Sequence, residues 1–466
     1  MKLALNIAIV LVITTQMARA DGASWKAGVA KADITPKAGM WMAGYGSRDH
    51  PAEGTLHKLW IRVLALQDAT GHVGVVVSSD TLGISQTIYN NTCRSLEKQF
   101  GLAPDQIMLH CSHTHSGPVL RGALHDIYPL DVAQLELIEE YSSQLEKQIV
   151  QSVGKALKNM GPAKVFGGQG NATFAVNRRN NSEGNVPQLR KEGRLKGPVD
   201  HDVPVLAVRN ADDVLLAVVF GYACHNTNLS WYQWSGDYAG FAQYALEEIY
   251  PDALAMFYMG CGADQNPIPR RTLELARGYG LRLAAAVERV LAESMQEFDA
   301  ELQTELEMIT LNLGEEPTRE QLATIAAAGQ TYRNRWAARL LKKIESGQVL
   351  ERTYPYPLQA WKLGKKQLWI TMGGEVVVDY ALGFKQQYGE DAWIAGYCND
   401  VMAYIPSLRV LDEDKPPSSG YEGNTSMMVY GRAAFRWADD IEDLIASTVR
   451  SLVKRLGLKT QEQTLR

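Results

Sequence analysis

Short hydrophobic runs alternate along the chain with longer amphipathic stretches. Unbroken apolar runs are typical of buried strands, and apolar residues that recur every three or four positions are typical of helices with one buried face. The pattern predicts strands near residues 27–36, 60–66, 73–79, 106–109, 205–208, 215–222, 254–259, 367–372 and 392–397. It predicts helices near residues 85–100, 130–160, 238–250, 272–295, 331–344 and 431–456. Strands alternating with helices indicate an α/β fold with a substantially parallel or mixed sheet and flanking helices, and the length fits one large domain or two ordinary ones.

Two of the predicted helical regions carry a further expectation. In the longest one, five apolar side chains fall on one face that we expect to be buried: Leu135, Ile138, Tyr141, Leu145 and Ile149. Residues 301–353 are more charged and partly helical. We interpret the basic helix within this segment as a solvated face rather than a surface for anionic lipid.

Polar side chains recur where the hydrophobic strands end. They are Asp80, His113, His115, His225, Asp264, Glu375 and Tyr404. In an open α/β sheet such strand ends meet at one crevice, where ligands bind. Two histidines and a carboxylate from separate strands would make an open zinc site, and a metal in it would polarise a carbonyl and acidify water. The residues alone therefore favour a metal-dependent hydrolase.

The densest part of this set is the stretch 109–118, which reads LHCSHTHSGP. His113 and His115 are separated by one residue, so an extended backbone would point both imidazoles to the same face. Neutral imidazoles in that arrangement suit a transition metal. Histidines that are merely hydrogen-bonded within a loop would give the same pattern, and that alternative stays open. The sequence has no H-E-x-x-H, the helical zinc-protease motif.

The N-terminal residues have the features of a secretory signal peptide. Lys2 precedes an apolar run over residues 3–14, and Ala18-Arg19-Ala20 provides small residues before the expected cleavage point. We expect residues 1–20 to be removed after Ala20, which leaves a secreted or periplasmic catalytic domain over residues 21–466. The net charge of −5 becomes more negative when Lys2 and Arg19 leave, and this argues against a nucleic-acid partner.

The cysteines do not predict a disulfide framework. There are five, an odd number, and they are widely scattered without a C-x-x-C pair. One pair could still form after export. Those inside or beside apolar runs, Cys111, Cys224 and Cys261, we interpret as inert buried thiols.

Several short motifs follow one another in a fixed order along the chain. They run from Ala32-Asp33-Ile34-Thr35-Pro36 through His113-Thr114-His115-Ser116-Gly117-Pro118, Asn177-Arg178, Ala223-Cys224-His225, Ser235-Gly236-Asp237, Gly374-Glu375 and the Tyr404 segment to Gly420-Tyr421-Glu422-Gly423. In this combination the chain resembles the neutral (non-lysosomal) ceramidase family. The resemblance implies a zinc-dependent amidase of lipid metabolism, with one zinc ion per chain. Such an enzyme cuts the N-acyl bond of ceramide-like lipids to give a sphingoid base and a fatty acid.

The resemblance also implies roles for individual residues. It gives His113, His225, Glu375 and Tyr404 as zinc ligands. It gives His115, Arg178 and Tyr421 as the polar residues at the reacting centre, where we expect His115, with help from Tyr421 or Arg178, to stabilise the oxyanion and protonate the amine. Three acids stay open between orienting the histidines and acting directly: Asp80, Asp237 and Asp264. The other histidines we interpret as ordinary residues: His50, His57, His72, His110, His125 and His201.

Two departures from the family pattern leave alternatives open. Asn266, within Asp264-Gln265-Asn266-Pro267, stands where the family has a serine. Asparagine cannot form an acyl-enzyme through a hydroxyl, so either water attacks directly, with Asn266 as a hydrogen-bond donor, or the substrate differs. The family's C-terminal immunoglobulin-like domain is also expected to be missing here. The alternatives are a metal-dependent amidase or esterase with a different N-acyl substrate, and a non-catalytic lipid-binding relative. Contact with a membrane surface and the oligomeric state stay open.

Overall fold

The computed structural model describes residues 24–37, 39–124, 126–415 and 420–460. The predicted signal peptide and His125 lie outside these residues. The largest sheet is mixed, with the strand order β11-β9-β8-β6-β1-β3-β4-β5, and β13 pairs with β6. In that order the strands are Leu254–Met259, Leu215–Tyr222, Asp202–Asn210, Gly161–Asn171, Trp25–Asp33, Trp60–Gln67, Val73–Ser79 and Ile107–Cys111, with β13 at Gln296–Phe298. Only the outer pairs, β4 with β5 and β9 with β11, are parallel among these strands.

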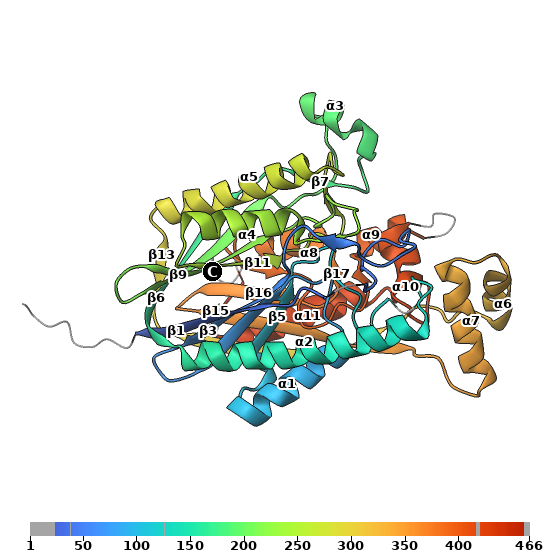
Figure 1. Cartoon of the computed structure of the whole chain (residues 1–466), viewed down its shortest axis with the longest axis horizontal. Coiled ribbons are helices and arrows are strands. Elements are labelled where there is room, and N and C mark those ends of the chain that lie inside the picture. Colours follow the sequence, from blue (N-terminus) through green and yellow to red (C-terminus); the bar gives the residue numbers. More distant parts are fainter. Residues whose placement is uncertain (1–23, 38, 125, 416–419, 461–466) are drawn as a thin grey trace, which may run out of the picture.

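Helices cover one face of this sheet. Helix α2 (Val132–Lys158) packs on β1 and β3, while α4 (Asp237–Ile249) and α5 (Leu273–Ala292) pack together over β11, β6 and β8 (Figure 1). Helix α1 (Gln86–Phe100) lies against α2. Alternate strand residues such as Val63, Val77 and Leu109 face the helices and form the main core with them.

A second sheet covers the opposite face. Its order is β14-β15-β16-β18, formed by Leu302–Asn312, Thr353–Leu363, Gln367–Met372 and Trp393–Ala395. Leu64, Val76 and Met108 of the large sheet share a buried cluster with Trp361 and Trp369 of the small one. Helix α11 (Ile441–Arg455) packs on β14 and β15, so the layers are helices, large sheet, small sheet and helix.

The remaining elements are short and lie around these layers. The helices are α3 (Val186–Lys191), α6 (Arg319–Ala327), α7 (Tyr332–Glu345), α8 (Val378–Tyr388), α9 (Leu408–Glu413) and α10 (Ser426–Val429). The 3-10 helices are η1 (Pro104–Gln106) and η2 (Glu183–Asn185), and η3 (Tyr421–Thr425) is a π-helix. Paired short strands are β2 (Gly54–Thr55) with β10 (Gln233–Trp234), β7 (Ala175–Asn177) with β12 (Gln265–Pro267), and β17 (Glu375–Val376) with β19 (Tyr404–Ile405). Within the part of the chain that is described, no helix has the length and apolar character needed to cross a bilayer.

The α/β architecture with mixed sheets and flanking helices is confirmed, but several local predictions were wrong. Strand β15 was missed because Pro355 and Pro357 interrupt it. Strand β16 pairs only with residues 358–363 of β15. The two prolines therefore face no partner strand on that side, and their lack of a backbone N–H leaves no carbonyl of β16 unbonded. Helix α11 begins at Ile441 rather than near 431, because Trp437 is buried and its Nε1 donates to the Tyr404 carbonyl. On α2, Leu135 is exposed, whereas Ile138, Leu145 and Ile149 are buried as expected.

The cysteines behave as the sequence indicated. All five are buried and free of disulfides. Burial raises the pKa of Cys111 to about 12 and that of Cys224 and Cys261 well above the ordinary range. Neutral thiols of this kind are inert packing residues.

Candidate metal centre

The curvature of the large sheet brings distant histidines together. Its two ends approach each other, with β11 in contact with β5 and the Ser78 hydroxyl donating to the Phe257 carbonyl at 2.5 Å. Just beyond β5 and β9, Thr114 and Asn226 form a parallel bridge. This bridge places His113 and His115, which flank Thr114, beside His225, which precedes Asn226.

His113 and His115 do meet, but not through the extended backbone that the spacing suggested. Strand β5 ends at Cys111, and His113 has a left-handed backbone with φ of +55°. The two Nε2 atoms nevertheless lie 3.2 Å apart. The ligand atoms of His113, His115 and His225 all fall within 4.8 Å of one another, so these three could hold a metal ion.

A carboxylate and a phenol complete the cluster. Glu375 of β17 pairs directly with Tyr404 of β19, which aligns the two side chains. Glu375 Oε2 lies 3.2 Å from His113 Nε2 and 3.1 Å from His225 Nε2. The Tyr404 hydroxyl lies 3.4 Å from His225 Nε2. All four side chains that the family resemblance gave as ligands therefore stand together in the protein interior.

The hydrogen bonds on the far side of two imidazoles fix how they face this cluster. His113 Nδ1 lies 2.6 Å from the Leu82 carbonyl oxygen, and His225 Nδ1 lies 2.7 Å from that of Gly262. A carbonyl can only accept, so each Nδ1 carries a hydrogen and each Nε2 turns toward Glu375. His115 differs from both, because its buried Nδ1 has no hydrogen-bond partner among the described residues.

The donor chemistry fits a divalent metal. Burial and the charge of Arg178 lower the pKa of His225 to about 4, so its imidazole is neutral at pH 7 and offers a bare Nε2 lone pair. That lone pair faces a carboxylate oxygen 3.1 Å away, and two electron-pair donors at this distance attract a cation between them. Burial alone would raise the pKa of Glu375, but positive charge at this point lowers it: with His113 and His225 protonated, the pKa of Glu375 lies well below its usual range. Burial and the Glu375 charge raise the pKa of Tyr404, which Arg178 opposes.

Two tyrosines that the sequence analysis missed hold the carboxylate. The Tyr430 hydroxyl donates to Glu375 Oε1, and the Tyr397 hydroxyl lies 3.4 Å from Oε2. Tyr397 ends the predicted strand 392–397, so the strand-end criterion used for the other residues would have found it. Tyr430 had no such signal, because it stands beside a stretch that was predicted to be helical.

A second polar cluster lies next to the donors. Arg178 donates from Nε to Glu422 at 2.9 Å, from Nη2 to the Tyr404 hydroxyl at 3.1 Å, and from Nη1 to Asn266 Oδ1 at 3.5 Å. Pairing of β12 with β7 is what brings Asn266 to this position. The guanidinium also lies over the rings of Tyr404 and Tyr421. Tyr421 is 40% exposed and thus marks the solvent side of the site.

Among the described residues, the three acids make no hydrogen bond to the histidine rings that they were suggested to orient. Asp80 pairs with Arg62 and accepts from the Trp60 amide. Asp237 accepts from the amides of Leu229 and Tyr238, which orders the chain after His225. Asp264 accepts from the Val378 amide and from Asn177, which ties together the segments carrying Glu375 and Arg178. Backbone carbonyls satisfy two of the imidazoles, so no carboxylate is needed there.

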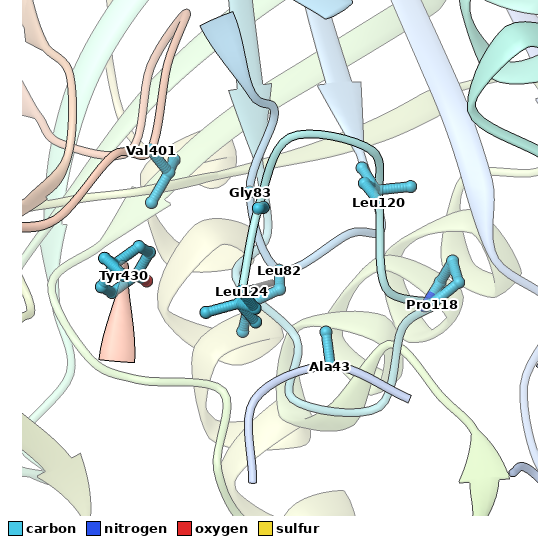
Figure 2. Close-up of a pocket in the computed structure, with 9 residues that line it drawn as sticks. Ala43, Leu82, Gly83, Pro118, Leu120, Leu124, Val401 and Tyr430 are labelled. Carbon is cyan, nitrogen blue, oxygen red and sulfur yellow. The ribbon is translucent and has the colours of Figure 1, made fainter. Parts of the chain in front are cut away.

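An apolar pocket adjoins the cluster. Its lining includes Leu82, whose carbonyl holds His113, and Tyr430, whose hydroxyl holds Glu375 (Figure 2). The other lining residues are small or aliphatic: Ala43, Gly83, Pro118, Leu120, Ala123, Leu124 and Val401. The polar centre thus has an apolar neighbour that shares two of its residues.

Comparison with known proteins gives a consistent match. Residues 25–256 match the family model described as neutral/alkaline non-lysosomal ceramidase, N-terminal. A neutral ceramidase from Pseudomonas aeruginosa is 27% identical over 250 residues, which are 52% of this chain but only 37% of that protein. Two solved structures, a ceramidase complexed with C2 and the neutral ceramidase from Pseudomonas aeruginosa, superpose with TM-scores of 0.69. Each superposition covers 94% of this chain and 76% of the other chain, at 17% and 18% sequence identity respectively. The two matches show a shared fold.

Proposed function

The chain belongs to the neutral/alkaline non-lysosomal ceramidase family, which its residues 25–256 match, and on this premise we propose that it is a zinc-dependent amide hydrolase. Its substrate in this proposal is a ceramide-like lipid, cut at the N-acyl bond to give a sphingoid base and a fatty acid. The observation that supports it most is the convergence of His113 and His225 on Glu375, with both Nδ1 atoms tied to carbonyls.

One zinc ion would be held by His113, His225, Glu375 and Tyr404. Zinc in such a site supplies a Lewis acid that polarises a carbonyl and acidifies water. The protein contributes the placement of the donors, because Tyr430 and Tyr397 fix the carboxylate while Leu82 and Gly262 fix the imidazoles.

His115 is suited to moving the proton. Burial and the neighbouring His113 and His225 lower its pKa well below the ordinary value, so it is neutral at pH 7 and can accept a proton from attacking water. The same Nε2 can then donate that proton to the leaving amine. Because His115 Nδ1 has no hydrogen-bond partner among the described residues, no hydrogen bond at that atom is broken when Nε2 gains or loses the proton.

Arg178 is suited to binding the oxygen of the acyl group. Its Nη1 and Nη2 face Asn266 and Tyr404, and its charge is permanent. Negative charge that develops on the carbonyl oxygen would be stabilised by this guanidinium, with the Tyr421 hydroxyl beside it. Asn266 cannot be acylated through a hydroxyl, so in this proposal water attacks directly and Asn266 acts only as a hydrogen-bonding neighbour of Arg178.

We further propose that the enzyme works after export, in the periplasm or outside the cell, as the predicted signal peptide implies.

The test is release of fatty acid from a fluorescently acylated ceramide by the purified chain, with zinc added or with a strong chelator. We expect release that the chelator abolishes and that is lost in His113→Ala and Glu375→Ala. His50→Ala is the matched control, because the His50 side chain is 44% exposed and lies outside the cluster; it should retain activity.

Each outcome has a distinct meaning. Wild-type turnover in His113→Ala and Glu375→Ala would refute the metal centre. Failure to release fatty acid by protein that contains stoichiometric zinc would refute ceramide as substrate and favour another N-acyl compound, to be sought with water-soluble amides and esters. Tight lipid binding without turnover and without dependence on metal would favour a non-catalytic relative.

A further inference from the structure

His115 lacks the hydrogen bond that orients the other two histidines. It is fixed to the chain by its backbone amide, which donates to the Asn226 carbonyl at 3.2 Å. Its Nδ1 is buried and has no partner in the described residues. The histidine side chain can still rotate about χ1 and χ2 when its backbone is fixed, so the orientation of the His115 ring must be set by packing.

The packing comes from a loop that no proposed chemical step uses, the 42–48 loop (MAGYGSR). The loop is aligned with the histidine segment by the bridge between Met42 and Pro118 and by the Ala43 amide, which donates to the Gly117 carbonyl at 2.8 Å. Gly44 then lies directly against His115. A Cβ atom on Gly44 would stand 2.4 Å from His115 Nδ1, and φ of +104° is also unfavourable for any other residue.

The next residue covers a face of the same imidazole. The ring centroids of Tyr45 and His115 are 4.9 Å apart, with the planes inclined at 53°. The Tyr45 hydroxyl is anchored to the Thr227 carbonyl at 3.2 Å, two residues after His225. The tyrosine therefore spans from one histidine segment to the other with its ring between them.

Arg48 holds the loop closed on this arrangement. It is buried, with 4% exposure, and its Nη1 donates to the Ala43 carbonyl at 2.7 Å. Its Nη2 donates to the His115 carbonyl at 2.9 Å and to the Trp231 carbonyl at 3.2 Å. The guanidinium also lies 4.9 Å from the Tyr45 ring centroid. One side chain thus ties together the loop, the backbone of His115 and the ring that packs on it.

We propose that Tyr45 and Arg48 are positioning residues that clamp His115 in one rotamer against His113 and His225, with Gly44 providing the space. The inference rests on the proposed function, in which His115 moves the proton. The clamp replaces the hydrogen bond that carbonyls make to the other imidazoles, and it leaves both nitrogens of His115 unbonded to the protein backbone.

A double-mutant cycle tests the clamp. The variants are Tyr45→Leu, His115→Ala and the two combined, assayed on the same fluorescently acylated ceramide. Because general acid–base catalysis contributes about 100-fold or more, we expect Tyr45→Leu to lower kcat at least tenfold, with KM and zinc affinity changed by less than about threefold. In the His115→Ala background the same change should have no further effect on kcat. Tyr45→Phe, which keeps the ring but loses the hydrogen bond to the Thr227 carbonyl, should lower kcat less than Tyr45→Leu does.

The matched control is Tyr244→Leu. Tyr244 packs on His57 with ring centroids 5.2 Å apart at 50°, nearly the geometry of Tyr45 on His115, but on a histidine outside the cluster. Its kcat should equal that of the wild type. If the fold-losses in kcat of Tyr45→Leu and His115→Ala multiply in the double variant, the inference is overturned. A wild-type kcat in Tyr45→Leu would also overturn it.

A structural readout is independent of turnover. In crystals of the metal-free protein we expect a single His115 rotamer in the wild type and displaced or mixed rotamers in Tyr45→Leu. If Tyr45→Leu does not fold, Gly44→Ala replaces it, because a Cβ atom on residue 44 would also displace the His115 ring. An unchanged His115 ring in both variants would overturn the clamp. If the wild type hydrolyses no amide, the proposed function fails, and this measurement still decides the clamp.

Discussion

The hydrogen bond from Tyr430 to Glu375 provides a direct test of how the metal centre is held. Glu375 Oε2 faces His113 and His225, while Oε1 accepts from the buried Tyr430 hydroxyl. Replacing Tyr430 with phenylalanine removes only that hydroxyl. The carboxylate then keeps Tyr397 alone as its phenolic partner, at 3.4 Å from Oε2.

The expected loss follows from the strength of such a bond. A buried hydrogen bond to a charged acceptor contributes about 1.5–3 kcal/mol, which corresponds to roughly a tenfold to hundredfold change in an equilibrium constant. Partners that orient a metal ligand typically change metal affinity by the same factor of about 10–100. We therefore expect Tyr430→Phe to raise the zinc dissociation constant by about 10–100-fold. Tyr397→Phe should have a smaller effect because its contact is longer.

Zinc affinity is measured by competition with a chromophoric chelator, and the free energy of unfolding of the metal-free protein is measured with denaturant. Tyr141→Phe is the control, since Tyr141 belongs to α2 and its hydroxyl donates to the Ile34 carbonyl at 2.6 Å, outside the cluster. It should bind zinc like the wild type. A zinc affinity in Tyr430→Phe within about twofold of wild type would refute Glu375 as a ligand held by this tyrosine.

Three further predictions concern other parts of the molecule. Arg178→Lys should lower kcat/KM roughly 100-fold in steady-state assays, because one ammonium cannot replace donors aimed at Asn266 and Tyr404; a loss confined to KM would contradict its transition-state role. Asn266→Ser should give no burst of acyl-enzyme in rapid-quench kinetics, and a trapped covalent acyl-serine would contradict a purely hydrogen-bonding role for this position. Burial raises the pKa of Asp400 to about 7 against the opposing bond from Tyr354. Its contribution to stability is therefore present below about pH 4 and lost as pH rises through 7, by up to about 4 kcal/mol, and Asp400→Asn should remove this loss in denaturant titrations while Asp252→Asn should not.

Strand ends were the most reliable guide to the site. Apolar runs that stop at a histidine or a glutamate located His113, His225 and Glu375, because the edge at which strands end is a property of the whole fold. What the pattern could not contain was how separate strand ends meet. The Thr114–Asn226 bridge and the pairing of Glu375 with Tyr404 depend on curvature and on short strands of two residues. Such contacts produce no periodic pattern of hydrophobic and polar residues by which they could be predicted.

The residues that support the donors were the least predictable. Acids at or beside strand ends were left open as orienting carboxylates, but Asp80 forms an ion pair with Arg62. The groups that orient the imidazoles are the carbonyls of Leu82 and Gly262, and every residue has a carbonyl. Tyr430 was missed for a related reason, since a buried phenol looks the same in sequence whether it packs in a core or holds a carboxylate.

This difference between carbonyls and carboxylates bears on the chemistry. Had two aspartates oriented the histidines, the centre would carry negative charge around Glu375, and a divalent cation would be more than neutralised. Neutral carbonyls leave Glu375 as the acid that faces both imidazoles. A divalent ion then brings one positive charge in excess of Glu375, whereas the charge of Arg178 on the side of Tyr421 is offset by Glu422. Amide hydrolysis passes through an anionic tetrahedral species, and an electropositive buried centre stabilises that species more than the neutral substrate. If the centre holds a metal as we propose, the choice of orienting group therefore suits hydrolysis of an amide better than simple retention of a neutral lipid.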